Sequence, residues 1–503
     1  MPCWNLTAKL LFLLFDITAI SNGHKILFIP GHRVPSHTKS MLPLARALHN
    51  AGHVVGFLQI VGAAEEKVNI EPMQDFTLNV TAEKQARSFF QRIWIADMRS
   101  PKEYLEPWRR AALACNKALL EYEESKSSIV DMVKKWDLLV IDNLFAPCGM
   151  VASSLTGVDW IDFSTTVMMA DMFRRNGLEM PLSVIPGFKV KHNEFDHRSF
   201  NHRVSNAVDG LQFSLLKAAL FFLFPYWIEQ SAREGRIVSF RSKPVYTFSS
   251  VPTYLTFLEP STISFVPLDY PCLNPPKLDE LYKTFIEDKS SKGTILIAAG
   301  HSVRWELAPR LFLQSFTDEL KNLSDYRIVW QYAGNQTAVE MPHVLARKWI
   351  PQVSILQHPK TVAFLTHCGY KSLREAICAD IPVIALPFFG DQFRNAAMVR
   401  KLSIGVHVDK ADVQKSALRS RCYEVIRNRK YKANVAKLNA LLNDKIIDDN
   451  WKANFLINFF FRHRKQNRCF ALAATSLSYV QLYCLDMFLI FLASIVAASG
   501  ILF

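Results

Sequence analysis

The sequence lacks the cysteine spacing of a metal or redox site. Nine cysteines are spread over 503 residues, and none of them forms a zinc-ligand or C-x-x-C pattern. The basic residues are also not interleaved with aromatic residues on any one stretch, so the net charge of +14 does not indicate nucleic acid as a partner. That charge suits an anionic ligand, an anionic membrane surface or simply a solvated surface. We expect no metal ion.

Length and composition indicate a folded protein with a large core. Hydrophobic residues make up 50% of the chain, which excludes a disordered protein and a small disulfide scaffold. A chain of this size has room for two large domains and additional membrane segments.

The amino-terminal residues 1–23 resemble a secretory signal peptide. Lys9 precedes the apolar run 10–15, and small residues follow it. An uncleaved anchor is the alternative, although the run is short for a membrane span. Either form predicts that the chain enters the endoplasmic reticulum, where three N-x-S/T sequons become candidate glycan sites: Asn79, Asn322 and Asn335.

The carboxyl-terminal residues 487–503 are apolar throughout. Their length is near the lower limit for a membrane helix. We expect a single-pass anchor in the endoplasmic reticulum membrane, with the catalytic domains in the lumen. The basic residues Arg462, Arg464, Lys465 and Arg468 would then lie in the lumen, against the positive-inside rule, so a truncated chain is the alternative.

The run 349–392 predicts two strand-loop-helix units in tandem. Residues 361–365 form a short buried strand that stops at a small, polar loop, and a helix follows from about residue 371 to 379. Residues 381–387 form a second buried strand, which ends at 390–392. Both loops open at strand carboxyl ends, where α/β sheets bind ligands and where a helix start favours phosphate.

The polar and aromatic residues of this run suit a sugar nucleotide. A flat aromatic such as Trp349 suits a base, the Glu375 carboxylate can accept two vicinal hydroxyl protons, and His367 beside a helix start suits pyrophosphate. Each also has a structural alternative, because Trp349 could be ordinary core and Ser372-x-x-Glu375 could be a capping box.

The order W-x-P-Q, H-x-G-x-x-S-x-x-E and D-Q in this run resembles the signature of UDP-glycosyltransferases, and among animal members it is most similar to the membrane-bound UDP-glucuronosyltransferases. The resemblance implies a donor site in which the helix start and His367 neutralise the leaving diphosphate. It assigns uracil stacking to Trp349, the ribose to Gln352 and Glu375, the diphosphate to His367 and Ser372, and the sugar hydroxyls to Asp391 and Gln392. Three further residues are candidates for binding the UDP-sugar: Gly300, Gly369 and Lys371.

Several positions of this donor site depart from the family pattern. Cys368 stands where the family has Gly, and Lys371 stands where it has Asn. Gly300 follows the strand at 293–299 in a turn that resembles the family's F-G-S turn, with Ala299 and His301 in place of Phe and Ser. A Cβ at Cys368 would crowd a backbone that needs positive φ, and Lys371 would replace an amide donor with a cation.

The amino-terminal half begins with a βαβ pattern. A strand at 25–30, a loop at 31–36 and a helix at 38–50 precede a second strand at 54–60. By resemblance, His37 is the catalytic base.

A later strand, 138–141, ends at Asp142, which the resemblance pairs with His37. His32 is the alternative base, and a helix cap is the alternative role for Asp142.

The remaining segments are assigned more coarsely. The polar, helical stretch 69–135 is expected to be acceptor-side scaffold, and 180–186 resembles the family element that borders the acceptor cavity. The apolar helix 211–224 is expected to be either a lid that contacts the membrane or part of the core.

The sequence therefore predicts an α/β protein of the GT-B type, with two Rossmann-like domains facing across a cleft and a carboxyl-terminal transmembrane helix. The acceptor domain is 24–270, the linker 271–292 and the donor domain 293–470. The expected reaction is inverting transfer of glucuronic acid, or glucose, from a UDP-sugar co-substrate to a hydroxyl of a small lipophilic acceptor, without a cofactor. Homo- or hetero-oligomers are left open. The rival hypothesis is a catalytically impaired UDP-sugar-binding or partner-regulating membrane protein.

Overall fold

The structure is a computed structural model that describes most of residues 23–501. The core of the expected signal peptide, within residues 1–22, lies outside the described residues. So do residues 502–503 and these internal positions: 63–66, 81–85, 101–102, 104, 125–128, 167–171, 174–175, 188–194, 228–242, 258–259, 261, 271, 415–416, 466–476, 478 and 483.

The first domain contains a seven-stranded sheet in which every pairing is parallel. The strand order is β3-β2-β1-β4-β5-β6-β7, so the chain reverses its direction of travel across the sheet between β1 and β4. In open parallel sheets, ligands bind at that point, outside the strand carboxyl ends. The strands are β1 (Lys25–Ile29), β2 (Val54–Gly62), β3 (Gln74–Val80), β4 (Leu138–Asp142), β5 (Trp160–Ser164), β6 (Thr247–Ser249) and β7 (Phe265–Pro267).

Helix α2 (Pro35–Asn50) connects β1 to β2 and begins three residues earlier than its apolar spacing predicts. Proline suits the first helical position, because its fixed φ is helical and its missing N–H has no partner there anyway. His37 therefore lies inside the first turn of the helix. The apolar face of the helix packs on the sheet through four buried residues: Met41, Leu44, Ala45 and Leu48.

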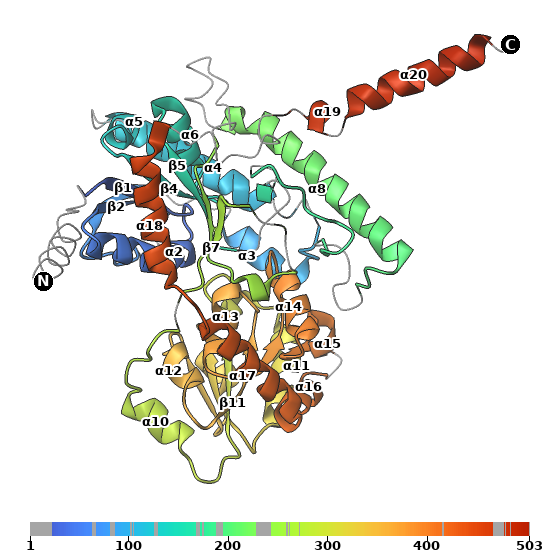
Figure 1. The fold of residues 1–503 in the computed structure, drawn as a ribbon. Helices are drawn as coiled ribbons and strands as arrows, with labels where there is room; N and C mark the ends of the chain where they lie inside the picture. Colours follow the sequence, from blue (N-terminus) through green and yellow to red (C-terminus); the bar gives the residue numbers. More distant parts are fainter. Residues whose placement is uncertain are drawn as a thin grey trace, which may run out of the picture.

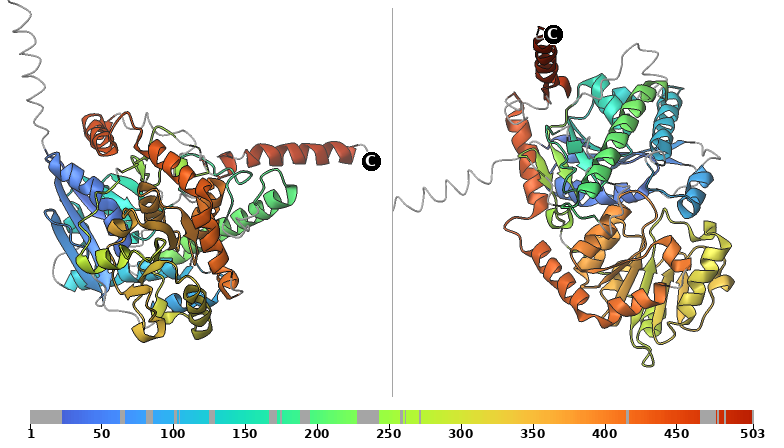
Figure 2. Two further views of the ribbon diagram at one scale, coloured as in Figure 1. Left: turned by 90° about the horizontal axis from the view of Figure 1, so that it is seen from below. Right: turned by 90° about the vertical axis from the view of Figure 1, so that its right-hand side faces the viewer.

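The second domain repeats this architecture with six parallel strands in the order β10-β9-β8-β11-β12-β13 (Figures 1 and 2). Its point of reversal lies between β8 and β11. The strands are β8 (Thr294–Ala298), β9 (Arg327–Gln331), β10 (Val344–Arg347), β11 (Thr361–Thr366), β12 (Val383–Ala385) and β13 (Gly405–His407). The prediction of two Rossmann-like domains is confirmed.

Helices cover both faces of the two sheets. In the first domain these are α4 (Leu105–Glu124), α5 (Ile129–Val133), α6 (Pro147–Thr156) and α8 (Phe200–Trp227). In the second they are α10 (Glu280–Ile286), α11 (Arg310–Lys321), α12 (Gln352–Leu356), α13 (Tyr370–Cys378), α14 (Gln392–Lys401), α15 (Lys410–Gln414), α16 (Leu418–Arg427) and α17 (Arg429–Asn443).

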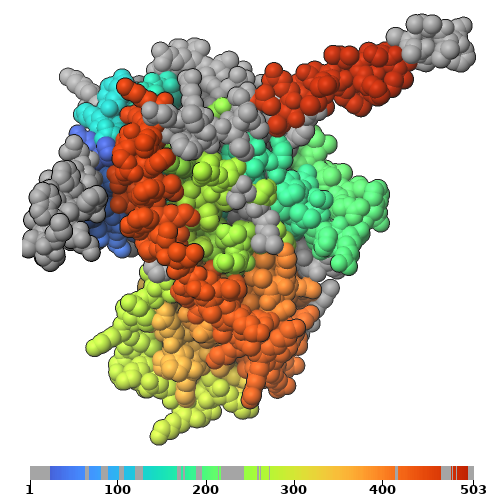
Figure 3. Space-filling view, viewed as in Figure 1, coloured from blue at the N-terminus to red at the C-terminus, as the bar shows by residue number. Residues whose placement is uncertain are grey.

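One helix from each domain's part of the sequence packs against the other domain. Helix α3 (Ala86–Ile95) precedes most of the first domain, yet Phe89, Ile93 and Trp94 lie in the core of the second. Helix α18 (Asp449–Arg462) runs back from the second domain and packs on α2 of the first. Figure 3 shows α17 and α18 as a continuous ridge over both domains. The boundaries expected from the sequence assign α3 to the first domain and α18 to the second. The packing differs because a sequence pattern marks an apolar helix face but not the element on which that face packs.

Two predictions for the first domain are corrected. The stretch 69–135 is not wholly helical, because β3 lies within it and pairs with β2. The apolar helix expected at 211–224 is part of α8, which begins at Phe200 and continues past Pro225 to Trp227. Leu211 and Leu215 are each 61% exposed, so these two side chains are not part of the core.

Helix α20 (Leu485–Ile501) extends away from both domains (Figure 1). Its side chains at 485–496 are exposed. Among the described residues, no helix reaches the length and apolarity needed to cross a membrane.

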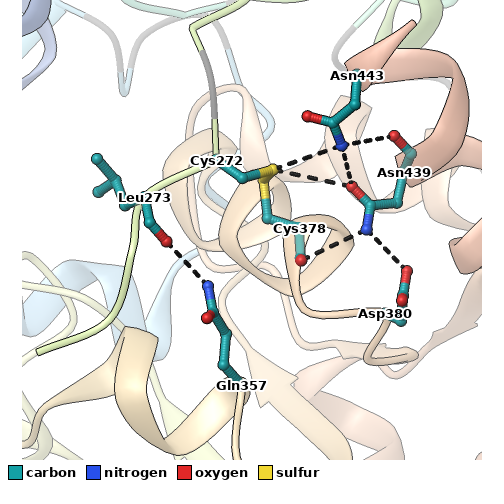
Figure 4. Close-up of a disulfide and its surroundings, with 7 residues drawn as sticks. All are labelled: Cys272, Leu273, Gln357, Cys378, Asp380, Asn439 and Asn443. Atoms are coloured by element: carbon teal, nitrogen blue, oxygen red, sulfur yellow. Dashed lines mark hydrogen bonds between the residues drawn. A yellow bond between two sulfur atoms is a disulfide. The ribbon is translucent and has the colours of Figure 1, made fainter. Parts of the chain in front are cut away.

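Two disulfides that the sequence pattern did not predict cross-link the chain. Cys115 on α4 is bonded to Cys148 on α6 within the first domain. Cys272, in the connection between the domains, is bonded to Cys378 at the end of α13. Figure 4 shows that Asn439 of α17 lies beside this second bond and donates to Asp380, at 3.0 Å. The connection is thereby fixed to the helix that follows β11.

Candidate active site

A histidine and an aspartate meet where β1 and β4 end. His37 Nδ1 lies 2.6 Å from Asp142 Oδ2, and both side chains are buried. The two strands are neighbours, with Ile29 paired to Ile141, which brings the helix after β1 against the end of β4. The expected pairing of these two residues is present. Because the hydrogen bond occupies Nδ1, Nε2 is the ring nitrogen left to take a proton.

The surroundings of Asp142 keep it ionised. Burial alone would raise the pKa of this carboxyl, but His37 and the N–H groups of Leu144 and Phe145, at 2.8 and 3.0 Å, outweigh burial and lower it. Thr165, just after β5, adds a hydroxyl 2.9 Å from His37 Nδ1 and 3.3 Å from Asp142 Oδ2. The sequence analysis missed Thr165, although it too follows a buried strand at the same sheet edge.

His32, the alternative base, has a structural position. It is buried, its ring Nε2 accepts from the Cys148 N–H at 3.2 Å, and its backbone N–H donates to the Phe145 carbonyl at 2.7 Å. Burial lowers the pKa of His32 to about 3, so the ring is neutral. His32, Cys115 and Cys148 also bring metal-ligating atoms together, but the two sulfurs are bonded to each other.

Apolar side chains surround the histidine–aspartate pair. The ring of Phe145 lies 5.6 Å from that of His37, and Trp108 lies 6.2 Å beyond Phe145. A small cluster of Leu144, Met172 and Phe173 adjoins them. The surroundings of the pair on the side of Phe145 are therefore largely hydrophobic.

In the second domain, α12 and α13 place a carboxylate and an amide in contact. Gln352 Nε2 donates to Glu375 Oε2 at 2.5 Å and to Ser372 Oγ at 3.3 Å. Burial raises the pKa of Glu375 against the opposing effects of Gln352 and Lys371. The capping-box alternative is wrong, because Gly369 is the N-cap of α13 and Ser372 lies within the first turn without capping it.

His367 lies between two glycines at the ends of β8 and β11. A Cβ on Gly300, which has φ of 69°, would lie 2.9 Å from the imidazole, and one on Gly369 would overlap it. Both positions therefore require glycine for the ring to fit. Burial lowers the pKa of His367 to about 4, so the ring is a neutral hydrogen-bonding group. The positive groups at this end of α13 are the helix start and Lys371.

Cys368 confirms the expected conflict between side chain and backbone. Its φ is +63°, in the left-handed region that costs a residue with a Cβ about 1–2 kcal/mol. The side chain is fully buried in the core of the second domain, and the carbonyl accepts from Asn395 Nδ2 at 3.0 Å. Its side chain therefore belongs to the core of the second domain while its backbone forms part of the loop.

Asp391 and Gln392 begin α14, after β12. Asp391 accepts from Asn395 at 3.0 Å, and burial raises the pKa of its carboxyl against the opposing effects of this hydrogen bond and of the nearby His37. Gln392 Oε1 accepts the N–H groups of Phe388 and Phe389 at 2.9 and 3.1 Å. Only the amide NH₂ of Gln392 is then left for a ligand.

Trp349 is 70% exposed, so the alternative that it is core is wrong. Its carbonyl accepts from the Tyr282 hydroxyl at 3.1 Å, which holds the backbone in place. Lys39 of α2 extends from the other domain and places Nζ 5.2 Å from the centre of the indole ring. No sequence pattern predicts this contact, because it joins residues far apart in the chain.

Lys371 also crosses the cleft. Its Nζ donates to the carbonyl of Ser36, the residue before His37. Burial lowers the pKa of Lys371 to about 7, Glu375 opposes this shift, and Lys39 adds to it. The residues expected to bind a donor thus lie opposite the histidine–aspartate pair.

Two parallel-sheet domains whose strand ends carry these residues define the glycosyltransferase class with two Rossmann-like domains. The chain belongs to the UDP-glucoronosyl and UDP-glucosyl transferase family, whose sequence profile matches residues 24–503. It is a glycosyltransferase that uses a UDP-sugar.

Its relatives include animal UDP-glucuronosyltransferases along almost the whole chain. It is 24% identical to UDP-glucuronosyltransferase 1A5 of Homo sapiens, covering 98% of this chain and 92% of the relative. It is 25% identical to UDP-glucuronosyltransferase 1A1 of Mus musculus, covering 100% and 94%.

Solved glycosyltransferases share the fold. Os79 from O. sativa, in complex with UDP, superposes with a TM-score of 0.56 at 15% identity, covering 87% of this chain and all of the other. VinC in complex with DTDP gives a TM-score of 0.55 at 15% identity, with the same coverage.

Proposed function

We propose that the protein transfers a glucuronosyl group, or else a glucosyl group, from the UDP-sugar to a hydroxyl of a small lipophilic acceptor, with inversion at the anomeric carbon. The observation that carries this proposal is the position of the His37–Asp142 pair, which faces the donor-side residues from the opposite domain. Lys371 reaches Ser36, and His37 lies close enough to Asp391 for the two side chains to interact electrostatically.

In the proposed reaction, His37 Nε2 accepts the proton of the acceptor hydroxyl as its oxygen attacks the anomeric carbon. The bond from that carbon to the diphosphate breaks, and UDP leaves with the bonding electron pair. Asp142 holds the imidazole through Nδ1 and stabilises the imidazolium as it forms. Attack from the face opposite the leaving group inverts the anomeric carbon.

The donor side has a side chain for each part of a UDP-sugar. Trp349 offers an exposed aromatic face for uracil, and Glu375 with Gln352 offers acceptors and donors for the ribose. His367, Ser372 and the start of α13 would bind the diphosphate. Asp391 and the Gln392 amide would bind the sugar hydroxyls. Glucuronic acid is favoured because the curated relatives carry that donor in their names.

The proposed acceptor class follows from the apolar side chains beside His37. Phe145 lies next to the imidazole and Trp108 packs against Phe145, so a compound with one hydroxyl on an aromatic or aliphatic body would bury apolar surface there. Asn206 of α8 accepts from the Gly187 N–H and donates to the Ile185 carbonyl, the latter at 2.7 Å. It thereby holds the segment proposed to border the acceptor.

We further propose that the domains lie in the lumen of the endoplasmic reticulum, with 487–503 as the membrane anchor. Two disulfides suit an oxidising compartment. All three sequon asparagines, Asn79, Asn322 and Asn335, are exposed. Extraction with alkaline carbonate tests the anchor: full-length protein should stay in the membrane pellet, and a chain that lacks 487–503 should be released.

The function is tested by turnover in purified membranes. Radiolabelled UDP-glucuronic acid and UDP-glucose are supplied separately with a panel of phenols, and glycoside formation is measured. Product from either donor, lost in membranes expressing His37→Ala, supports the proposal and names the donor. UDP binding without turnover of any acceptor would favour the rival, a UDP-sugar-binding protein whose catalysis is impaired by the departures at Cys368 and Lys371.

A further inference from the structure

Two lysines face the donor region from opposite domains. Lys39 extends from α2 of the first domain and lies over the indole ring of Trp349. Lys371, in the first turn of α13, extends from the second domain to the carbonyl of Ser36. The two ammonium groups are close enough for Lys39 to disfavour the charge on Lys371.

The positive charge of this region is only partly balanced. Glu375 is the acidic side chain that favours the charge of Lys371, and it is shared with Gln352 through the 2.5 Å hydrogen bond. The start of α13 adds its own partial positive charge. Two ammonium groups, a helix start and one carboxylate leave an excess of positive charge, which suits an anion between the domains.

We propose that Lys39 and Lys371, one from each domain, together bind the diphosphate of the nucleotide-sugar donor. This inference rests on the proposed function, and it assigns the donor site a residue, Lys39, from the domain opposite the one that binds the rest of the donor. In this arrangement the neutral His367 supplies hydrogen bonding, and the lysines supply the charge. A base that stacks on Trp349 competes with the Lys39 ammonium for the indole ring. The displaced ammonium then pairs with the diphosphate.

Donor binding is then linked to proton uptake. The pKa of Lys371 is about 7 without a ligand, because burial and Lys39 outweigh Glu375. At pH 8 most of Lys371 is therefore neutral, and a bound diphosphate raises its pKa and draws a proton from the buffer. At pH 6 the side chain is already charged, so binding takes up almost none.

The experiment is calorimetric titration of the full-length protein in buffers of different ionisation enthalpy, at pH 8 and pH 6. The probes are UDP-glucuronic acid and UDP-glucose, whose diphosphates hold no titratable proton in this range, and uridine, which has no phosphate. We expect uptake approaching one proton at pH 8 with the UDP-sugars, little at pH 6, and none with uridine.

Four variants separate charge from titration. Lys371→Arg keeps a permanent charge, so it should still bind UDP-sugars but without proton uptake. Lys371→Met and Lys39→Met should each weaken UDP-sugar binding by roughly tenfold to a hundredfold, the range for a charge-assisted hydrogen bond, while neither weakens uridine binding. Lys292→Met is the matched control, because Lys292 pairs with Asp325 on the surface.

Absence of proton uptake at pH 8 in the wild type, or unchanged UDP-sugar affinity in both methionine variants, overturns the proposal. If the wild type turns over donor while these results fail, only the lysine pair is wrong. If the wild type binds no UDP-sugar at all, the proposed function is contradicted as well.

Discussion

The points of reversal in the two sheets, between β1 and β4 and between β8 and β11, lie beside very different sites. At β1 and β4, His37, Asp142 and Thr165 are buried and already hydrogen-bonded to one another. In the second domain, Trp349, which follows β10, is exposed, and the charge of Lys371, which follows β11, is incompletely balanced. The proposed base is oriented before any substrate arrives, whereas the proposed donor side has positive charge and aromatic surface left for a ligand. The same architecture thus supports a preorganised half of the site in the first domain and, in the second, a half that a ligand would complete.

The largest expected effect comes from the preorganised half. Asp142→Asn removes the charge that stabilises an imidazolium and allows an amide NH₂ to face Nδ1, which would hold the wrong tautomer. We expect kcat to fall by about 10²–10⁴-fold with little change in UDP affinity. Initial rates and UDP binding on the same preparation check this, and an unchanged kcat would show that the pair has no catalytic role.

The same substitution changes the pH dependence of stability. The folded pKa of Asp142 lies below its unfolded value, so the carboxylate contributes stability above the unfolded pKa and loses it as pH falls through the folded pKa. The Asp142→Asn variant should lack this loss of stability at acidic pH. Denaturant midpoints of both proteins, measured from pH 6 downward, should converge toward low pH; parallel curves would contradict the assignment.

The next effect concerns the disulfide between the domain connection and α13. Replacing Cys272 and Cys378 by alanine should lower the free energy of unfolding by about 2–4 kcal/mol. The sequence separation is 106 residues, against 33 for Cys115–Cys148, so chain entropy makes its loss about 1 kcal/mol more costly. Denaturant unfolding of both double variants tests this, and a larger loss for the shorter loop would oppose it.

A smaller effect is expected from the aromatic platform. Trp349→Ala should weaken UDP binding by about 1–3 kcal/mol, the range for an aromatic side chain stacked on a base. Trp451→Ala, on the exposed face of α18, is the matched control. Equal UDP affinities in the two variants would mean that Trp349 does not hold the base.

The smallest effect distinguishes two buried cysteines. Cys368 has positive φ, whereas Cys422 lies within helix α16. Glycine relieves strain at the first position and adds backbone freedom at the second, so Cys368→Gly should be the better tolerated by about 1–2 kcal/mol. Unfolding midpoints measure the difference, and equal losses would show that the left-handed position carries no strain.

The sequence predicted what depends on local pattern. Buried β-branched runs marked the strands, and parallel strands place their carboxyl ends at one edge, which brings His37 near Asp142 and His367 near Gly300. The conflict between the Cys368 side chain and its backbone was predictable because the family has glycine at this position. These are consequences of strand direction and backbone geometry, both of which are encoded nearby in the chain.

Contacts between distant segments were not predictable in this way. Lys39 meets Trp349, and Lys371 meets Ser36, only after two domains have folded and faced each other. The same holds for α3 in the core of the second domain and for both disulfide pairings. Neither the charge of an exposed lysine nor an apolar helix face indicates which distant residue it will contact.

The most direct test of the account compares the two histidines near β1. Initial rates with an acceptor found in the phenol panel, and UDP binding, are measured for wild type, His37→Ala and His32→Gln, with unfolding midpoints as a check on folding. The account predicts that His37→Ala lowers kcat by about 10²–10⁴-fold and leaves UDP affinity nearly unchanged, because the other domain holds most of the donor. His32→Gln should keep most of the activity of whatever fraction is folded. Full turnover by His37→Ala, or loss of turnover confined to folded His32→Gln, would contradict it.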